Sequence, residues 1–480
     1  MRRKSTDGVA DPDRRRLLAG LATAPVAAAM TSCSDDNGPA GGVSPAPEPP
    51  AGKTLPRPED SGIDHFVIVM MENRSFDHML GWVPGADGVQ AGLRYPDKKG
   101  RLIETFPLAG HPEYGFQGCG KEDPDHGYDG GRKHLNGGRM DGWLATVGDV
   151  SVDSDHFPIG YYRREDLPFF AGCADHWTIC DRYFHGILAS TFPNRIYLHA
   201  GETDRTSNTI EASSLPTIWD RLSDAGVSGR YYFHDLPVTA LWAAKYLALS
   251  TRFEQFLLDA AMGTLPAVSI VDPRFVGEAP NGISNDDHPQ ADVRNGQSFM
   301  NSVYDALRNS PQWEKSLLVV VYDEWGGFYD HVVPPLAPVS AAEGDPNGAV
   351  RNDGRLGFRT PCILIGPRAP RQVSSLQLDV NSVLNMLCWR WRLPPLGARG
   401  SWSLNMAYAL DFDSAPRTDA PAFDVGLGPF GQECVTGLPF PIPQLPGSPG
   451  KLSAAQIKQA QHNLEWLQLG ELARAHGFIR

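Results

Sequence analysis

The sequence predicts an α/β fold with a mostly parallel central sheet flanked by helices. Apolar runs rich in β-branched residues alternate with segments whose apolar residues recur at helical spacing, and this alternation is typical of a parallel sheet with crossover helices. Polar residues directly follow such a run at 72–73, at 234 and at 323–324. The carboxyl ends of parallel strands meet at one edge of a sheet, where ligands bind. We therefore expect a functional site at that edge.

Residues 1–33 have the features of an export signal. An arginine pair at Arg14-Arg15 precedes an Ala-rich apolar segment that ends near Met30. The apolar part is too short to span a membrane, and paired arginines indicate twin-arginine export. Small residues before Cys33 resemble a lipoprotein cleavage site, which would make Cys33 a lipid attachment site. The alternative is an ordinary cleavage nearby without lipid. We expect a periplasmic, envelope-anchored or secreted protein.

The charge and the cysteines narrow the class of protein further. The formal net charge is −13, and residues 1–33 carry six Lys or Arg and three Asp, so the rest carries −16. Such an acidic chain is a poor nucleic-acid binder and is not drawn to anionic lipid. The charge is compatible with binding to zwitterionic lipid. An exported chain can form disulfides, and Cys173 and Cys180 are close enough in sequence to bridge locally.

The composition divides the chain into four parts. Residues 1–33 are followed by a segment rich in Pro, Gly and Ala at 34–60, which predicts a disordered linker. A catalytic body is expected at 61–415, with long loop excursions over 84–142, where Gly is frequent and periodicity is weak. Residues 416–480 form a Pro/Gly-rich segment and a C-terminal helix. This extension either packs on the body or offers a surface to a partner.

Glu72 and Asn73 lie in the sequence between the first predicted strand and the first predicted helix of the body. The apolar run 66–71 predicts a buried strand, and 76–80 predicts a helix with Asn73 or Ser75 as its cap. Glu72 and Asn73 offer hard oxygen donors, which suit one half of a divalent-cation site. The alternative is a capped helix start whose glutamate favours the positive helix end.

Thr191 lies just before a helix start that contains Pro193. A hydroxyl there is normally a cap, but it can also be a nucleophile, because a helix N-terminus attracts phosphate and a metal lowers the hydroxyl pKa. The strongest apolar run, 317–322, leads directly into Asp323 and Glu324, a second acidic pair. Further strands are expected at 230–234, 265–271 and 360–366, and further helices at 166–175, 215–225, 293–309, 382–391 and 453–476.

The side chains expected at the sheet edge suit phosphoester cleavage. Hard oxygen ligands favour Mg²⁺, Ca²⁺ or Mn²⁺, and histidines extend the choice to Zn²⁺ or Fe. A metal ion would activate Thr191, and histidines would protonate the departing alkoxide. This chemistry proceeds through a phosphothreonine intermediate. The expected set comprises Glu72, Asn73, Asp323 and Glu324 as metal ligands, Thr191 as nucleophile, and His126, His234 and His288; His126 taken alone is typical of a solvated loop histidine.

Five motifs spread over residues 63–400 contain most of these side chains. They are MENRSFDHMLGW (71–82), STFPNRIYLHAG (190–201), NDDHP with DVRNGQ (285–297), YDEWGGFYDHV (322–332) and RLGFRTPCILIGP (355–367). On these motifs the chain resembles the bacterial phospholipase C / acid phosphatase phosphoesterase family. That family includes the plant non-specific phospholipases C and looks like a branch of the alkaline phosphatase superfamily.

The resemblance implies an alkaline phosphatase-like fold, one divalent metal ion and a role for each matched residue. Thr191 matches the nucleophile, which is Thr in phospholipase members and Ser in acid phosphatases. Trp325 and Val380 stand where the family often has histidine, which affects the substrate pocket. The remaining matches are Glu72, Asn73, Asp323 and Glu324 to the metal ligands, His126, His234 and His288 to the phosphate pocket, and His331 to a residue behind the metal ligands.

These implications define three expected functions. The first is an exported, metal-dependent phospholipase C that cleaves the glycerol-side phosphoester of a phospholipid such as phosphatidylcholine, giving diacylglycerol and a phosphorylated head group. It would contact membranes transiently or through a lipid anchor. The second is an acid phosphatase that acts at the same site. The third is a non-catalytic surface lipoprotein that keeps the fold and binds lipid or a protein partner.

Overall fold

The computed structural model describes most of residues 42–480. The predicted signal, Cys33 and the first part of the predicted linker lie outside the described residues. No helix in the described part is long and apolar enough to cross a membrane. Residues left out within this range are 119–120, 122, 147–154, 276–283, 346, 349 and 433–453, together with the side chains of 454–464.

Eight strands form the central sheet. They are β1 (His65–Met71), β6 (Thr178–Cys180), β8 (Gly229–Phe233), β9 (Ser250–Arg252), β10 (Val268–Asp272), β11 (Ser316–Tyr322), β12 (Cys362–Ile365) and β13 (Gln372–Ser374). Their order across the sheet is β13-β6-β12-β11-β1-β10-β8-β9. Strand β12 runs antiparallel to both of its neighbours, and every other pairing is parallel. The predicted mostly parallel α/β sheet is confirmed.

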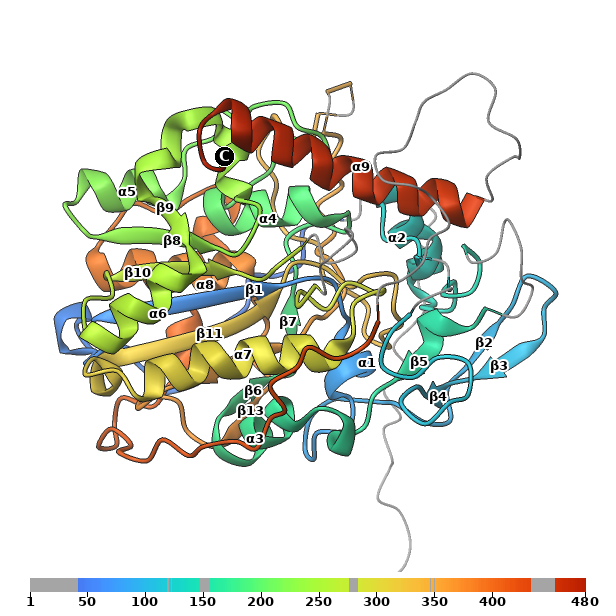
Figure 1. Ribbon diagram of the computed structural model, residues 1–480, viewed down its shortest axis with the longest axis horizontal. Helices are drawn as coiled ribbons and strands as arrows, with labels where there is room; N and C mark the ends of the chain where they lie inside the picture. The colour runs from blue at the N-terminus through green and yellow to red at the C-terminus, as the bar shows by residue number, and fades with distance from the viewer. Residues whose placement is uncertain are drawn as a thin grey trace, which may run out of the picture. The chain divides into compact units, whose positions relative to one another are not determined.

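Helices cover both faces of this sheet. In the view of Figure 1, α6 (Phe253–Met262) and α7 (Val293–Arg308) lie in front of the sheet, and α8 (Val380–Trp391) lies behind it. The remaining α-helices are α1 (Phe76–Leu80), α2 (Tyr128–Leu135), α3 (Pro168–His176), α4 (Thr191–Ala200), α5 (Ile218–Asp224) and α9 (Ala454–Ala475); small pairs are formed by β2 (Arg94–Pro96) with β3 (Leu102–Glu104), β4 (Phe106–Pro107) with β5 (Gly160–Tyr161), and β7 (Tyr183–Phe184) with β14 (Leu378–Asp379).

The two central strands, β1 and β11, determine where the site lies. Both consist of apolar residues that are buried on both faces, apart from His65 at the start of β1, as expected for the interior of a covered parallel sheet. They pair in parallel with Met71 opposite Tyr322. The next residue on each strand is acidic, so Glu72 and Asp323 emerge side by side at the carboxyl edge.

Two expectations for flanking features are wrong. Residues 42–60 are not a free linker, because they hydrogen-bond along the body: Ser44 N–H donates to the Leu336 carbonyl (2.8 Å), and Lys53 Nζ donates to the Leu410 carbonyl (2.7 Å). Cys173 and Cys180 are both buried free thiols. Cys173 lies on α3 and Cys180 in the sheet, so their closeness in sequence does not bring the sulfurs together.

The C-terminal helix packs on the body, which is the first of the two alternatives considered for it. Leu469 and Ala473 of α9 are fully buried. Figure 1 shows α9 running across the end of the molecule that carries α4 and α2. The helix therefore belongs to the same folded body as the sheet.

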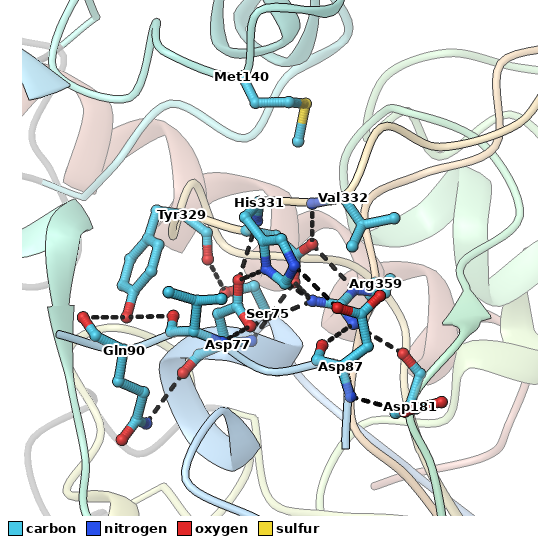
Figure 2. Close-up of polar contacts among 12 residues, drawn as sticks. Ser75, Asp77, Asp87, Gln90, Met140, Asp181, Tyr329, His331, Val332 and Arg359 are labelled. Carbon is cyan, nitrogen blue, oxygen red and sulfur yellow. Dashed lines mark hydrogen bonds and ion pairs between the residues drawn. The ribbon is translucent and has the colours of Figure 1, made fainter. Parts of the chain in front are cut away.

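A buried arginine joins four segments below the carboxyl edge. The Arg359 guanidinium is fully buried and donates to Asp330 Oδ1 (2.9 Å), Asp77 Oδ1 (3.1 Å) and the carbonyls of Asp87 and Asp181 (2.5 and 2.8 Å). Figure 2 shows Asp77, Asp87 and Asp181 around Arg359. The first motif, the motif after β11 and the end of β6 are held together by this one side chain.

We expect the R359A substitution to destabilise the fold by about 3–5 kcal/mol, because it leaves the buried carboxylates of Asp77 and Asp330 uncompensated. Urea unfolding followed by circular dichroism measures the change. The control is R371A, which removes an exposed arginine. Equal unfolding midpoints for the two variants would show that Arg359 is not a structural clamp.

Candidate active site

Thr191 and Glu72 meet at the carboxyl edge of the sheet. Thr191 is the first residue of α4, and its Oγ1 donates a hydrogen bond to Glu72 Oε1 at 3.1 Å. The expected cap role is not what the structure shows, because the hydroxyl bonds a carboxylate rather than the helix backbone. A hydroxyl that points at a carboxylate from a helix N-terminus can lose its proton to that carboxylate, while the helix end favours an incoming anion.

Asn73 and Gly326 allow the two acidic motifs to approach closely. Asn73 has a left-handed backbone (φ 44°), and so has Gly326 (φ 61°). A Cβ at position 326 would lie 2.1 Å from the carbonyl oxygen of Asn73. Only glycine fits this contact without displacing the backbone. Glu324 is fixed in the same loop, since its Oε2 accepts from the Gly326 N–H at 2.7 Å.

Arg195 connects α4 to the sheet edge. It lies one helical turn after Thr191, on the same helix face. Its Nε donates to Asp323 Oδ2 (3.0 Å), and one terminal nitrogen donates to Asp272 Oδ1 (3.1 Å). The guanidinium is buried and stacks 4.5 Å from the Phe275 ring centroid. These contacts set the depth at which Thr191 sits against Glu72.

The carboxyls at this edge carry more negative charge than their surroundings neutralise. Burial raises the pKa of Glu72 well above its ordinary value, and the charges of Asp323 and Asp286 add to the effect. Burial also raises the pKa of Asp323 to about 7, although Arg195 opposes it. Buried carboxyl groups that lie this close together are stable only if a bound cation balances their charge or if one of them is protonated.

Glu324 leads to a second group of ligands. His126 Nδ1 lies 2.5 Å from Glu324 Oε1, and its Nε2 lies 3.5 Å from Asp123 Oδ2. His288 Nε2 lies 3.8 Å from the other Asp123 oxygen. Burial lowers the pKa of His126, but Glu324 and Asp123 outweigh burial and hold that pKa well above its ordinary value. The structure therefore brings His126 and His288 together with the acidic pair.

The segment that carries His288 is attached to the first motif. Glu72 N–H donates to the Asp286 carbonyl (2.7 Å), and the buried Arg74 donates to the carbonyls of Asp287 (2.6 Å) and His288 (3.1 Å). Arg74 lies two residues after Glu72 and had no role in the sequence-based prediction. It holds the imidazole-bearing turn at the sheet edge.

His234 lies apart from His126 and His288 and packs among aromatic side chains. It follows β8, which is separated from β1 by β10. Its ring packs against Phe253 (4.4 Å between centroids) and Phe299 (5.4 Å) from α6 and α7. Burial lowers the pKa of His234 to about 4. The prediction that His234 lines the phosphate pocket is corrected: it lines a separate cavity of about 830 Å³ between α6 and α7.

His331, which the resemblance placed behind the metal ligands, contacts the carboxylates around Arg359. Its Nδ1 lies 2.6 Å from Asp77 Oδ2 and its Nε2 lies 3.1 Å from Asp87 Oδ1 (Figure 2). Asp77, Asp330 and His331 are close enough to chelate an ion, but Arg359 already donates to both carboxylates. This group is therefore an ion-pair cluster of the fold.

Trp325 and Val380 are accommodated without disturbing the ligands. The Trp325 side chain is fully buried, stacks on His185 (5.4 Å, 8° between planes), and its Nε1 donates to His134 Nδ1 at 3.2 Å. Val380 is buried in the first turn of α8. Both residues are part of the packing, so neither departure from the family pattern removes a group from the Thr191–Glu72 contact.

The donor set fits a divalent cation. Glu72 Oε2 and the side-chain atoms Oδ1 and Nδ2 of Asn73 are buried without a hydrogen-bond partner in the described part of the chain. Such atoms are rare unless an ion or water binds them. The ligand atoms of Asp123, His126 and His288 also lie within 4.8 Å of one another. Oxygen and imidazole donors of this kind are those that divalent metals use in proteins.

Several of these residues were missing from the sequence-based prediction. Arg195 carries a signal, because it lies four residues after Thr191 on one helix face. Asp123 precedes His126 by three residues, which is a weak signal. Arg74 carries no sequence signal, because its role depends on a contact with Asp287, 213 residues away.

Known proteins resemble this chain along most of its length. A model described as the Phosphoesterase family matches residues 63–394. Non-specific phospholipase C6 of Arabidopsis thaliana is 28% identical over 395 residues, covering 75% of this chain and 74% of the relative. Phospholipase C A of Mycobacterium tuberculosis is 29% identical over 468 residues (83% and 88%), and phospholipase C B is 31% identical over 433 residues (75% and 80%).

Solved structures align with parts of this chain at low TM-scores. Murine ectonucleotide pyrophosphatase / phosphodiesterase 5 aligns with 52% of this chain and 97% of that chain, at 10% identity and a TM-score of 0.35. A protein in the alkaline phosphatase superfamily from Vibrio parahaemolyticus aligns at a TM-score of 0.32 and 10% identity, covering 50% and 64%. These scores carry no functional argument. The family match over residues 63–394 does: the chain belongs to the Phosphoesterase family and is a phosphoric ester hydrolase.

Proposed function

We propose that the chain is an exported, metal-dependent phospholipase C that cleaves the glycerol-side phosphoester of phosphatidylcholine or a related phospholipid. The hydrogen bond from Thr191 Oγ1 to Glu72 Oε1 carries the proposal, because it places a nucleophile and a proton acceptor together at a helix N-terminus. Relatives named phospholipase C, at 29% and 31% identity, support the substrate class. Export rests on residues 1–33 alone.

Each step of the reaction has a matching group. Thr191 Oγ attacks phosphorus and its proton passes to Glu72. The bond to the glycerol oxygen breaks, and the departing alkoxide takes a proton from an imidazolium and leaves as diacylglycerol. His126 suits that donor, because Glu324 and Asp123 raise its pKa. Water then gives one proton to His126 as its oxygen attacks phosphorus. The bond from phosphorus to Thr191 Oγ1 breaks, Thr191 takes its proton back from Glu72, and the phosphorylated head group departs.

A divalent metal ion would be held by side chains that the structure leaves available. Glu72 Oε2 and Asn73 Oδ1 are buried without a hydrogen-bond partner among the described residues, and Asp323 and Glu324 are the other two proposed ligands. When bound, the ion would stabilise negative charge on the phosphoryl oxygens and lower the hydroxyl pKa. Arg195 keeps Asp323 aligned and favours its ionised form, and His126 and His288 can donate hydrogen bonds to the remaining phosphoryl oxygens.

We expect T191A to lower kcat for phosphatidylcholine by about 10³-fold or more, because the attacking oxygen is lost. T191S keeps a hydroxyl and should retain part of the activity. T54A, at an exposed threonine, is the matched control. Release of diacylglycerol and phosphocholine measures turnover. Wild-type turnover in T191A would rule out Thr191 as the nucleophile.

Chelation provides an independent test of the metal and the substrate. We expect EDTA to abolish phosphatidylcholine hydrolysis and added divalent cations to restore it, because the buried carboxylates need a cation. The same assays with p-nitrophenyl phosphate separate the two enzyme functions. Hydrolysis of p-nitrophenyl phosphate without phosphatidylcholine cleavage would favour an acid phosphatase. Turnover that is insensitive to EDTA would contradict the metal requirement.

A further inference from the structure

The C-terminal helix α9 returns the end of the chain to the nucleophile. Its Trp466 is buried and stacks on Phe275, with 4.2 Å between ring centroids and 15° between planes. The same indole meets Phe192 edge-on at 5.4 Å. Phe192 directly follows Thr191 in α4. The helix therefore packs on the turn that carries the attacking hydroxyl.

A chain of two hydrogen bonds runs from α9 to that same turn. The Phe192 N–H donates to Asn208 Oδ1 at 2.7 Å, and Asn208 Nδ2 donates to Glu465 Oε2 at 2.8 Å. Ser190, at the N-cap position of α4, makes no capping bond with its side chain. Asn208 thus caps the helix from a distant loop, and Glu465 determines which way the Asn208 amide faces.

Glu465 also interacts electrostatically with residues of the candidate active site. Glu465 is largely buried, and burial raises its pKa to about 7, while the charges of His126 and Asp123 act on it in opposite directions. Glu465 therefore lies near the imidazole of the proposed proton donor. By contrast, Glu471 on the same helix is exposed.

We propose that Asn208 and Glu465 are positioning residues for Thr191, so that α9 completes the active site. The inference rests on the proposed phosphoester cleavage at Thr191. The first turn of a helix has N–H groups without intrahelical partners, and a side-chain acceptor fixes the turn that bears them. Asn208 can accept from Phe192 only while its amide nitrogen faces Glu465. The nucleophile then stays aligned with Glu72.

Two single substitutions on α9 test the link in the full-length chain. We expect E465A to lower kcat about 10-fold with KM changed less than about threefold, since a misaligned nucleophile slows the chemical step rather than binding. E471A is the matched control and should behave as wild type. Thermal midpoints for both variants separate misalignment from unfolding. If E465A and E471A have equal kcat, the inference is overturned.

Exchanging the hydrogen-bond donor and acceptor between positions 208 and 465 distinguishes positioning through the hydrogen bond from simple packing. N208D keeps the acceptor for Phe192 but sets a carboxylate against Glu465. Assayed about 1.5 pH units above the Glu465 pKa, it should lose about 10-fold or more in kcat, because the two charges repel. N208D/E465Q restores the bond with donor and acceptor exchanged, and E465Q alone is the reference. We expect kcat of the pair to return to within about fivefold of wild type.

The outcomes separate this inference from the function on which it rests. A double variant as slow as N208D overturns the inference. The packing is the same in both variants, so only the restored hydrogen bond could have raised kcat. A wild-type chain that hydrolyses neither phosphatidylcholine nor p-nitrophenyl phosphate overturns the proposed function and the inference with it. An active wild type whose kcat is unchanged in E465A and N208D overturns the inference alone.

Discussion

The buried acidic residues at the carboxyl edge are the constraint on which the site depends. Glu72, Asp272 and Asp323 follow or end three neighbouring strands, and none of them faces bulk water. Burying carboxylates without compensation costs several kcal/mol each. Arg195 bonds two of them, so α4 must dock where its guanidinium reaches both. Thr191 lies one turn earlier on that helix and arrives beside the third.

The same edge shows how backbone geometry supports the chemistry. The parallel register of β1 with β11 brings two acidic residues together that are 251 positions apart. The glycine that follows Trp325 then lets the two loops touch backbone to backbone. Because both loops are also fastened below by Arg359, the ligands rest on a rigid frame. Preorganisation of this kind lets charged groups act without reorganising during the reaction.

Much of the fold and half of the site could be predicted from the sequence. Long apolar runs such as 317–322 predict strands well, because burial on both faces leaves a strong signal. Glu72 and Asp323 followed from their places after such strands. His234 follows a strand too, yet its side chain turns to α6 and α7, and sequence position does not specify a face. Residues 42–60 have a composition typical of linkers, but hydrogen bonds to distant loops hold them in place.

The bond between Asn208 and Glu465 spans 257 residues. A chain synthesised from its N-terminus forms contacts in the order in which segments become available. The five motifs all end before position 400, whereas Glu465 is made only after them. A polypeptide released early would thus contain all five motifs and still lack the side chain that we propose supports its reactive turn. In the proposed arrangement, the catalytic geometry is complete only once α9 has been made and has docked.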